Sequence, residues 1–107
     1  MKAQMFNDQR WIEDKALAHN PANIRKMFDL RLNLSGFTVL AFTEHFFDPH
    51  GYTALWLLGE SHLAIHTFPE EDKIYVEMSS CVEEPFKQYI MLADSYDSFT
   101  NKENHWP

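Results

Sequence analysis

The middle of the chain consists of strand-like segments that are separated only by short turns. The segments are rich in β-branched and aromatic residues, and they are residues 37–47, 52–58, 61–68 and 73–81. Residues 61–68 are either a third strand or the continuation of the second. Asp48-Pro49-His50-Gly51 and Pro69-Glu70-Glu71-Asp72 have the composition of turns. Because short turns join antiparallel neighbours, this region predicts an antiparallel sheet.

Helical signals lie on both sides of these segments. Asn20-Pro21 provides a capping residue and a proline for the first helical turn, and Ser35-Gly36 provides the end of that helix. A second helix opens at Pro85, and its apolar residues follow the i, i+3, i+4, i+7 pattern: Phe86, Tyr89, Ile90 and Ala93. Helix, antiparallel strands and helix together predict an α+β two-layer sandwich.

The two ends of the chain carry weaker patterns. Ala3 to Phe6 is compatible with a short strand, and Trp11 to Ala18 with a helical turn or two. Residues 95–107 are polar, so we expect a frayed tail there.

Composition narrows the functional classes. A length of 107 residues predicts a single domain over residues 1–107. The net charge of −7 argues against nucleic acid, and the longest apolar stretch, Tyr52 to Leu58, is too short to span a membrane. Cys81 is the sole cysteine, which fits a reducing cytoplasm. The 15% aromatic content is high for a small chain, so part of the apolar surface is expected to form a subunit interface.

Chemically versatile residues are concentrated around the Glu60–Ser61 bond. The Ser61 hydroxyl can attack the Glu60 carbonyl and convert the amide to an ester. Elimination of that ester and hydrolysis would then leave a pyruvoyl ketone at residue 61. Such a ketone forms a Schiff base with a substrate amine and accepts electrons during decarboxylation. Histidine suits the proton removal during maturation, and a thiol suits a later protonation.

Hairpin geometry relates these residues to one another. If Phe68 pairs with Ile74, then Ser61 lies opposite Cys81, and opposed residues share a sheet face. His66 lies an odd number of residues from Ser61 and therefore faces the other side. A site that uses both would need a bulge or a bend between them.

The same residues are compatible with other interpretations. Serine, histidine and cysteine in a sheet are most often structural. His62 and His66 have the spacing of a metal pair on a helix, but on a strand they are roughly 13 Å apart, so we expect no metal. A serine hydrolase would need the strand–turn–helix elbow with its glycines, which the sequence does not contain.

Residues 59–70 read GESHLAIHTFPE. They resemble SESHLTIHTWPE, the processing-site signature of bacterial and archaeal S-adenosylmethionine decarboxylase proenzymes. Residues 44–51 resemble the FHRFxPxG segment of the same family, and residues 75–81 resemble its (V/I)D(V/L)FTC segment. The three blocks match without a gap over residues 44–81.

The resemblance implies an autocatalytic zymogen that cleaves into residues 1–60 and 61–107. By this resemblance Ser61 becomes the pyruvoyl cofactor, His66 acts in processing, and Cys81 donates a proton to the decarboxylated substrate. It also implies a sheet with two helices on one face and a homodimer whose active sites use both protomers.

The resemblance further implies S-adenosylmethionine as the substrate and supply of the aminopropyl donor for spermidine synthesis. Phe47 matches a position that packs against adenine, and Phe68 and Glu70 match positions near the substrate. Phe68 replaces the usual tryptophan, and Met78-Ser79-Ser80 replaces the aliphatic-Phe-Thr run. A pyruvoyl decarboxylase of arginine or ornithine, and a paralogue that binds without processing, are therefore alternatives.

Overall fold

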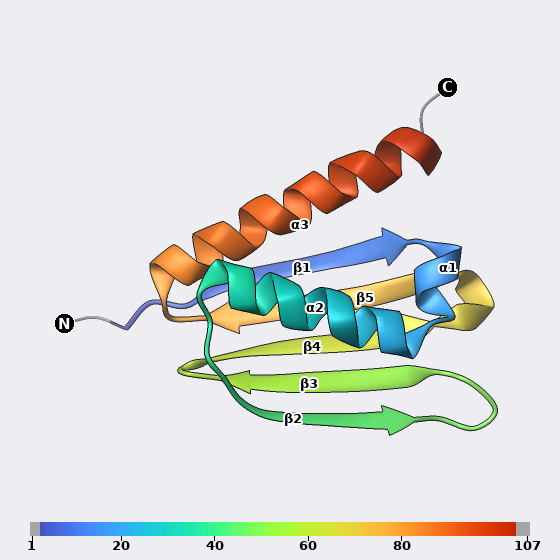
Figure 1. The fold of residues 1–107 in the computed structure, drawn as a ribbon, viewed down its shortest axis with the longest axis horizontal. Helices are drawn as coiled ribbons and strands as arrows, with labels where there is room; N and C mark the ends of the chain where they lie inside the picture. The colour runs from blue at the N-terminus through green and yellow to red at the C-terminus, as the bar shows by residue number, and fades with distance from the viewer. Residues whose placement is uncertain (1–2, 105–107) are drawn as a thin grey trace.

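The computed structural model describes residues 3–104, which form one sheet and its covering helices (Figure 1). The elements in chain order are β1 (Phe6–Glu13), α1 (Lys15–Ala18), α2 (Pro21–Ser35), β2 (Val39–Phe46), β3 (Tyr52–Leu58), β4 (Ser61–Phe68), the 3₁₀ turn η1 (Pro69–Glu71), β5 (Lys73–Ser80) and α3 (Glu83–Asn104). None of the helices within this part of the chain is long and apolar enough to cross a bilayer.

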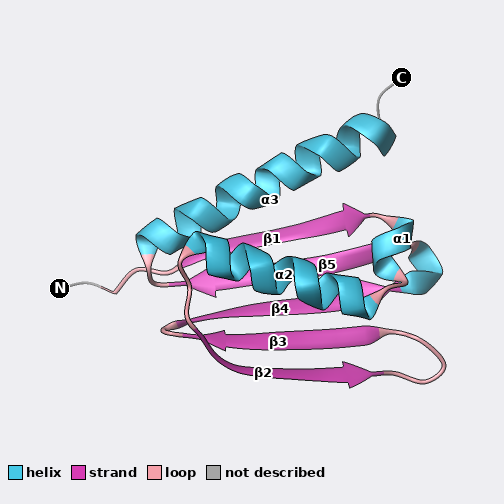
Figure 2. Ribbon diagram, viewed as in Figure 1, coloured by secondary structure: helices cyan, strands magenta, loops and turns pink. Residues whose placement is uncertain are grey.

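The strands form a five-stranded sheet in the order β1-β5-β4-β3-β2, and every neighbouring pair is antiparallel. Figure 2 shows α2 lying across the sheet and α3 running obliquely along its β1 edge, away from α2, with the short α1 at one end. The predicted α+β two-layer sandwich is therefore confirmed. The strands at 39–46, 52–58, 61–68 and 73–80 lie where the turn and strand patterns predicted them.

Helix α2 begins and ends at the predicted signals. The Asn20 side chain accepts a hydrogen bond from the Asn23 amide, and Pro21 occupies the first turn. Gly36 adopts a left-handed conformation with φ 94°, which a residue without a side chain adopts at little cost.

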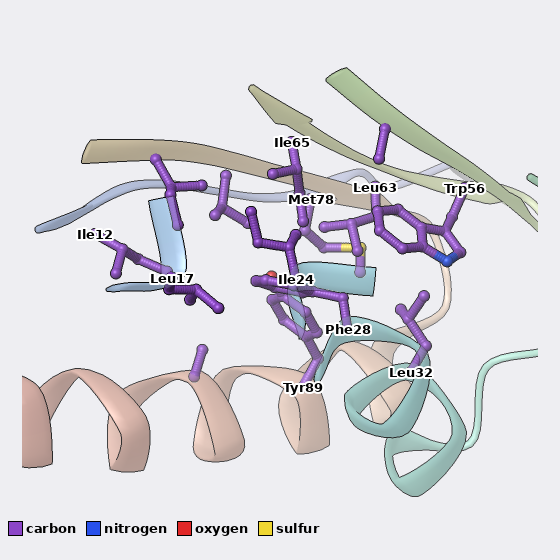
Figure 3. Packing of buried hydrophobic residues seen from close by; sticks show 14 of the residues in the cluster. Ile12, Leu17, Ile24, Phe28, Leu32, Trp56, Leu63, Ile65, Met78 and Tyr89 are labelled. Atoms are coloured by element: carbon purple, nitrogen blue, oxygen red, sulfur yellow. The ribbon is translucent and has the colours of Figure 1, made fainter. Parts of the chain in front are cut away.

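The core lies between the helices and the sheet (Figure 3). Fully buried Ile24, Phe28 and Leu32 of α2 pack with Tyr89 and Ala93 of α3 over the central strands. The strands contribute a second set of fully or almost fully buried side chains, which includes Trp56, Leu63, Ile65, Ile74, Val76 and Met78. Burial of this kind stabilises by about 1.5–3 kcal/mol for each large side chain, so packing holds the helices on this face.

The N-terminal prediction was wrong in part. Residues 6–13 form a strand, and helix occurs only at 15–18. The alternation that marks a half-buried strand was hidden because Asp8 and Arg10 occupy helix-facing positions of β1. They are tolerated there because the Arg10 guanidinium bonds Asp8 at 2.7 Å and Asp97 of α3 at 2.7 Å.

The prediction of a frayed C-terminal tail was also wrong for most of its length. Helix α3 continues to Asn104, and residues 105–107 lie outside the described part of the chain. Contacts with the N-terminal segment hold its second half. Arg10 bonds Asp94 at 3.0 Å, and the Tyr96 hydroxyl donates to Asp14 at 2.6 Å.

The β4–β5 hairpin has a register one residue away from the predicted one. Phe68 pairs with Lys73 rather than Ile74, so Ser61 lies opposite Ser80 and not opposite Cys81. The 3₁₀ turn and the left-handed Asp72, with φ 54°, close this hairpin with four residues. Loop length and turn type determine hairpin register, and composition alone had not defined them.

Candidate active site

The Glu60–Ser61 bond lies in the tight turn between β3 and β4. Leu58 pairs with Ser61, so Gly59 and Glu60 alone make the connection. Glu60 has a positive φ of 56°. The adjacent Gly59, which could adopt a positive φ at little cost, does not have one. A side chain in this region costs about 1–2 kcal/mol, so the residue before the candidate cleavage point is strained.

Two donors from Cys81 converge on the carbonyl oxygen of Glu60. The Cys81 backbone amide lies 3.3 Å from this oxygen, and the Cys81 Sγ also lies 3.3 Å from it. Paired donors on a carbonyl oxygen stabilise the negative charge that forms there when a nucleophile attacks its carbon. The shifted register therefore brings the thiol to the carbonyl of residue 60 rather than to Ser61 itself.

The Ser61 side chain is buried on the helix-facing side of the sheet. Its exposure is 5%, and its Oγ donates to the Oγ of Ser80 at 2.7 Å. Ser80 is fully buried. Sequence reasoning did not single out Ser80, because the predicted register placed Cys81 opposite Ser61.

His66 lies on the other face of the sheet. Its Nδ1 is 2.9 Å from the Oγ1 of Thr53, and its ring stacks on Tyr75 with centroids 6.3 Å apart. The pairing of β4 with both neighbours runs without a register shift, so no bulge brings His66 round to Ser61. Five residues of strand separate the two side chains, which is roughly 16 Å. Thr53 is a further candidate that the sequence pattern did not reveal.

The predicted substrate-binding residues gather at the end of the sheet that is remote from Ser61. Phe47 lines a cavity of about 250 Å³ with His50 and Pro69, and His50 Nε2 lies 3.6 Å from the Glu70 carboxylate. Phe68 contacts Trp11 with ring centroids 5.5 Å apart. The length of β4 separates this end from Ser61 by roughly 23 Å. One chain therefore does not bring the two groups of residues together.

An aromatic cluster extends this end of the sheet onto its outer face. Trp11 lies 5.2 Å from Tyr75 between ring centroids, and the Lys73 ammonium lies 5.1 Å from the Trp11 ring centre. Trp11 remains 54% exposed. It was missed because its segment had been interpreted as helical.

The outer face of the sheet also carries exposed aliphatic side chains. Leu55 and Leu57 of β3 are 43% and 54% exposed, while the alternate residues of β3 are buried under the helices. A groove of about 340 Å³ runs over Leu55, Leu57, Ala41 and Thr43 to His62. No helix of residues 3–104 covers this face (Figure 1).

Within residues 3–104 no three His, Cys, Asp or Glu side chains come together as a metal site would require. His62 and His66 lie on one strand and pair with different residues of β3, Leu57 and Thr53. The groups that lie at the Glu60–Ser61 turn are the hydroxyls of Ser61 and Ser80 and the thiol of Cys81.

The fold and the turn together define a class of protein. It is a small α+β sandwich in which a Glu-Ser bond lies in a strained hairpin turn and a cysteine thiol contacts the glutamate carbonyl. The chain belongs to the S-adenosylmethionine decarboxylase family, whose sequence profile matches residues 9–104.

Curated relatives and a solved structure resemble the chain over different lengths. The S-adenosylmethionine decarboxylase proenzyme of Methanococcus aeolicus is 36% identical over 73 residues, which are 68% of this chain and 62% of that protein. The S-adenosylmethionine decarboxylase proenzyme 2 of Bacillus anthracis is 49% identical over 49 residues, which are 46% and 40% respectively. The chain thus spans less than two thirds of either relative.

The crystal structure of the Aquifex aeolicus adenosylmethionine decarboxylase superimposes with a TM-score of 0.70 at 21% identity. The superposition covers 85% of this chain and 81% of that one. At this identity the likeness supports the fold alone.

Proposed function

We propose that the chain is a proenzyme that cleaves itself between Glu60 and Ser61 and then decarboxylates S-adenosylmethionine. The observation that carries the proposal is the geometry of the turn. The Glu60 carbonyl oxygen accepts hydrogen bonds from the amide and thiol of Cys81. The hydroxyl of the next residue, Ser61, is buried and donates to Ser80. The names of the Methanococcus and Bacillus relatives support the same activity.

Maturation would begin with attack of Ser61 Oγ on the Glu60 carbonyl carbon. The new C–O bond replaces the C–N bond, and the hydroxyl proton ends on the Ser61 nitrogen. A base then removes the α-proton of Ser61, the Glu60 carboxylate leaves, and water converts the dehydroalanine to pyruvoyl with release of ammonia. The Cys81 donors would stabilise the oxyanion of the first step.

The residues around the turn fit a pyruvoyl group at position 61. When present, this group supplies a ketone that condenses with a substrate amine and withdraws electrons as carbon dioxide leaves. The Cys81 thiol already lies beside the carbonyl of residue 60, so it would remain next to the new N-terminus. From there it would donate a proton to the substrate carbon that has lost carbon dioxide.

The active site would be shared between two copies of the chain. His66, Phe68 and Glu70 lie towards the opposite end of β4 from Ser61, and His66 faces the outer side of the sheet. A homodimer formed through the outer faces, with the chains antiparallel, would bring these residues to the outer side of the partner's Glu60–Ser61 turn, next to the partner's Cys81. The exposed Leu55 and Leu57 would then be buried, which supports this arrangement.

S-adenosylmethionine suits the remote end of the sheet. Phe47, Phe68 and Trp11 offer aromatic faces to a nucleoside base, and the exposed Glu70 carboxylate suits ribose hydroxyls or a sulfonium. The product would serve as the aminopropyl donor for spermidine synthesis. The single cysteine suits a cytoplasmic enzyme, since thiols remain reduced there.

Intact-mass spectrometry of the purified protein tests the cleavage. We expect two fragments, residues 1–60 and 61–107, with the second lacking a free α-amine. Ser61→Ala should remain intact, because alanine has no hydroxyl. A wild-type chain that stays intact after prolonged incubation would favour a binding protein that does not process.

Release of labelled carbon dioxide tests the substrate. S-adenosylmethionine should be preferred over arginine and ornithine. Preference for either amino acid would overturn the substrate and leave the cleavage proposal standing.

Mixing two inactive variants tests the shared site. Ser61→Ala cannot form the pyruvoyl group, and His66→Ala lacks the proposed processing imidazole. Co-expression should restore cleavage of the His66→Ala chain, because the Ser61→Ala partner supplies His66. If cleavage does not recover in mixed dimers, the two residues do not act across the interface.

A further inference from the structure

We infer that Ser80 is a positioning residue for self-cleavage, holding the Ser61 hydroxyl while the adjacent Cys81 holds the Glu60 carbonyl. The inference rests on the proposed self-cleavage and adds a residue to it. Ser80 and Cys81, which are consecutive residues, would thus hold the attacking hydroxyl of Ser61 and the carbonyl of Glu60 that it attacks.

The hydrogen bonds of Ser80 support this role. Ser61 Oγ donates to Ser80 Oγ at 2.7 Å, and the Val82 amide donates to the same oxygen at 2.9 Å. Ser80 Oγ in turn donates to the Val82 carbonyl at 3.3 Å. The Val82 amide and carbonyl therefore fix the Ser80 hydroxyl, which accepts a hydrogen bond from the Ser61 hydroxyl.

The hydrogen bond between Ser61 and Ser80 is shielded from water. Ser80 is fully buried and Ser61 is 5% exposed, so water does not readily replace the bond between them. An acceptor on the Ser61 proton raises the electron density on Oγ and restricts its rotation about χ1. Both effects favour attack on a neighbouring carbonyl that Cys81 already polarises.

Ser80 is not the base of the reaction. Its own proton is directed at the backbone carbonyl of Val82, which does not accept a full proton. The hydroxyl therefore orients Ser61, and the proton must pass to the leaving nitrogen or to another group. This distinguishes Ser80 from the imidazole assigned to the partner chain.

The neighbouring Ser79 provides a matched control. Its hydroxyl donates to Asn7 Oδ1 of β1 at 2.6 Å, on the opposite face of β5 from Ser80. Ser79 has the same side chain and is adjacent to Ser80, but its hydroxyl bonds β1 rather than the turn at 59–61. Ser79→Ala should therefore leave cleavage unchanged.

The test compares Ser80→Thr with Ser80→Val, which have the same shape and differ in the hydroxyl. Cleavage of freshly synthesised chain is followed by mass over time. We expect the threonine variant to cleave within about twofold of wild type. The valine variant should cleave on the order of tenfold more slowly, the loss expected for one hydrogen bond. Cleavage should also fall more than turnover per mature subunit, which a merely structural role would not produce.

The outcomes separate the two proposals. If wild type cleaves and Ser80→Val matches it, Ser80 has no positioning role and the proposed function stands. If wild type never cleaves, both proposals are overturned. Should the extra methyl groups prevent folding, Ser80→Ala against Ser79→Ala decides, with melting measured in the Ser61→Ala background. Equal cleavage by the two alanine variants would overturn the inference.

Discussion

At the scale of single residues, Glu60 adopts a backbone conformation that disfavours its side chain, because its φ is positive. The chain places a glycine at 59 and a glutamate at 60, yet the positive φ falls on the glutamate. Elsewhere the chain uses glycine where φ is positive, at Gly36 and Gly51, apart from Asp72 at the other hairpin. Backbone strain tends to be retained where function requires it, and here it lies next to Ser61, the proposed nucleophile.

Replacing Glu60 by glycine should relieve this strain. In the Ser61→Ala background, which stays intact, Glu60→Gly should raise the melting temperature by about 2–4 °C. The relief is about 1 kcal/mol, and the greater freedom of glycine in the unfolded chain offsets roughly half of it. Calorimetry measures the shift. Glu60→Ala is the control, because it removes the carboxylate but keeps the side-chain penalty, so a comparable rise there would contradict the strain argument.

Tyr89 carries a pH-dependent part of the stability. Burial raises the pKa of its hydroxyl from 10.0 to about 12, while the positive charge of Arg31 opposes the shift. The folded chain therefore keeps the proton after the unfolded chain has lost it. The contribution of Tyr89 to stability is complete below pH 10 and is lost as the pH rises towards 12, by up to about 3 kcal/mol.

Tyr89→Phe should remove this dependence. Urea unfolding between pH 9 and 12 should show a shallower loss of stability than in wild type, because phenylalanine has no proton to lose. An unchanged slope would mean that other groups dominate alkaline unfolding.

At the scale of elements, β1 and α3 depend on each other through Arg10. The guanidinium bonds Asp8 on its own strand and Asp94 and Asp97 on the helix, and its side chain is 15% exposed. These bonds raise the pKa of Arg10 above its already high value, chiefly through the hydrogen bond to Asp8. They also explain why a polar terminal segment remains helical.

Arg10→Ala should loosen the second half of α3. We expect a loss of about 2 kcal/mol in the free energy of unfolding, because the substitution leaves the carboxylates of Asp8 and Asp97, which are 19% and 24% exposed, without this guanidinium. Hydrogen exchange should rise in the backbone of residues 94–104. Arg25→Ala should cost less than about 1 kcal/mol, since Arg25 is 48% exposed and its ion pairs are longer, at 3.6 and 3.7 Å.

The elements also show what a sequence can predict. Asn20, Pro21 and Gly36 act locally, so the bounds of α2 could be read from them. β1 could not be recognised, because Asp8 and Arg10 occupy inward positions. They are compensated there by their mutual ion pair and by the bonds of Arg10 to a helix some 85 residues later. The Glu60–Ser61 bond could be singled out from its motif. The proposed role of Ser80 could not be predicted, because it depends on the register of the β4–β5 hairpin. That register is set at the far end of the two strands, by a four-residue turn that ends at the left-handed Asp72.

At the scale of the whole molecule, the helices within residues 3–104 cover one face of the sheet and leave the other uncovered. We expect that uncovered face to be the dimer interface. Leu57→Glu should therefore produce a monomer in analytical ultracentrifugation and abolish cleavage, because a charge at a buried interface is costly. Leu34→Glu is the control, since Leu34 is 61% exposed but belongs to α2. A dimeric Leu57→Glu variant would exclude this face as the interface.

The strand order determines what happens to the two pieces once the bond between residues 60 and 61 is broken. The piece that begins at Ser61 contributes β4 and β5 to the centre of the sheet, and the other piece contributes β1 on one flank and β3 and β2 on the other. The shorter piece is therefore interleaved within the longer one. To leave, it would have to break complete hydrogen-bonded ladders on both sides at once. The proposed cut would thus convert one chain into a two-chain subunit whose halves could not be exchanged without unfolding.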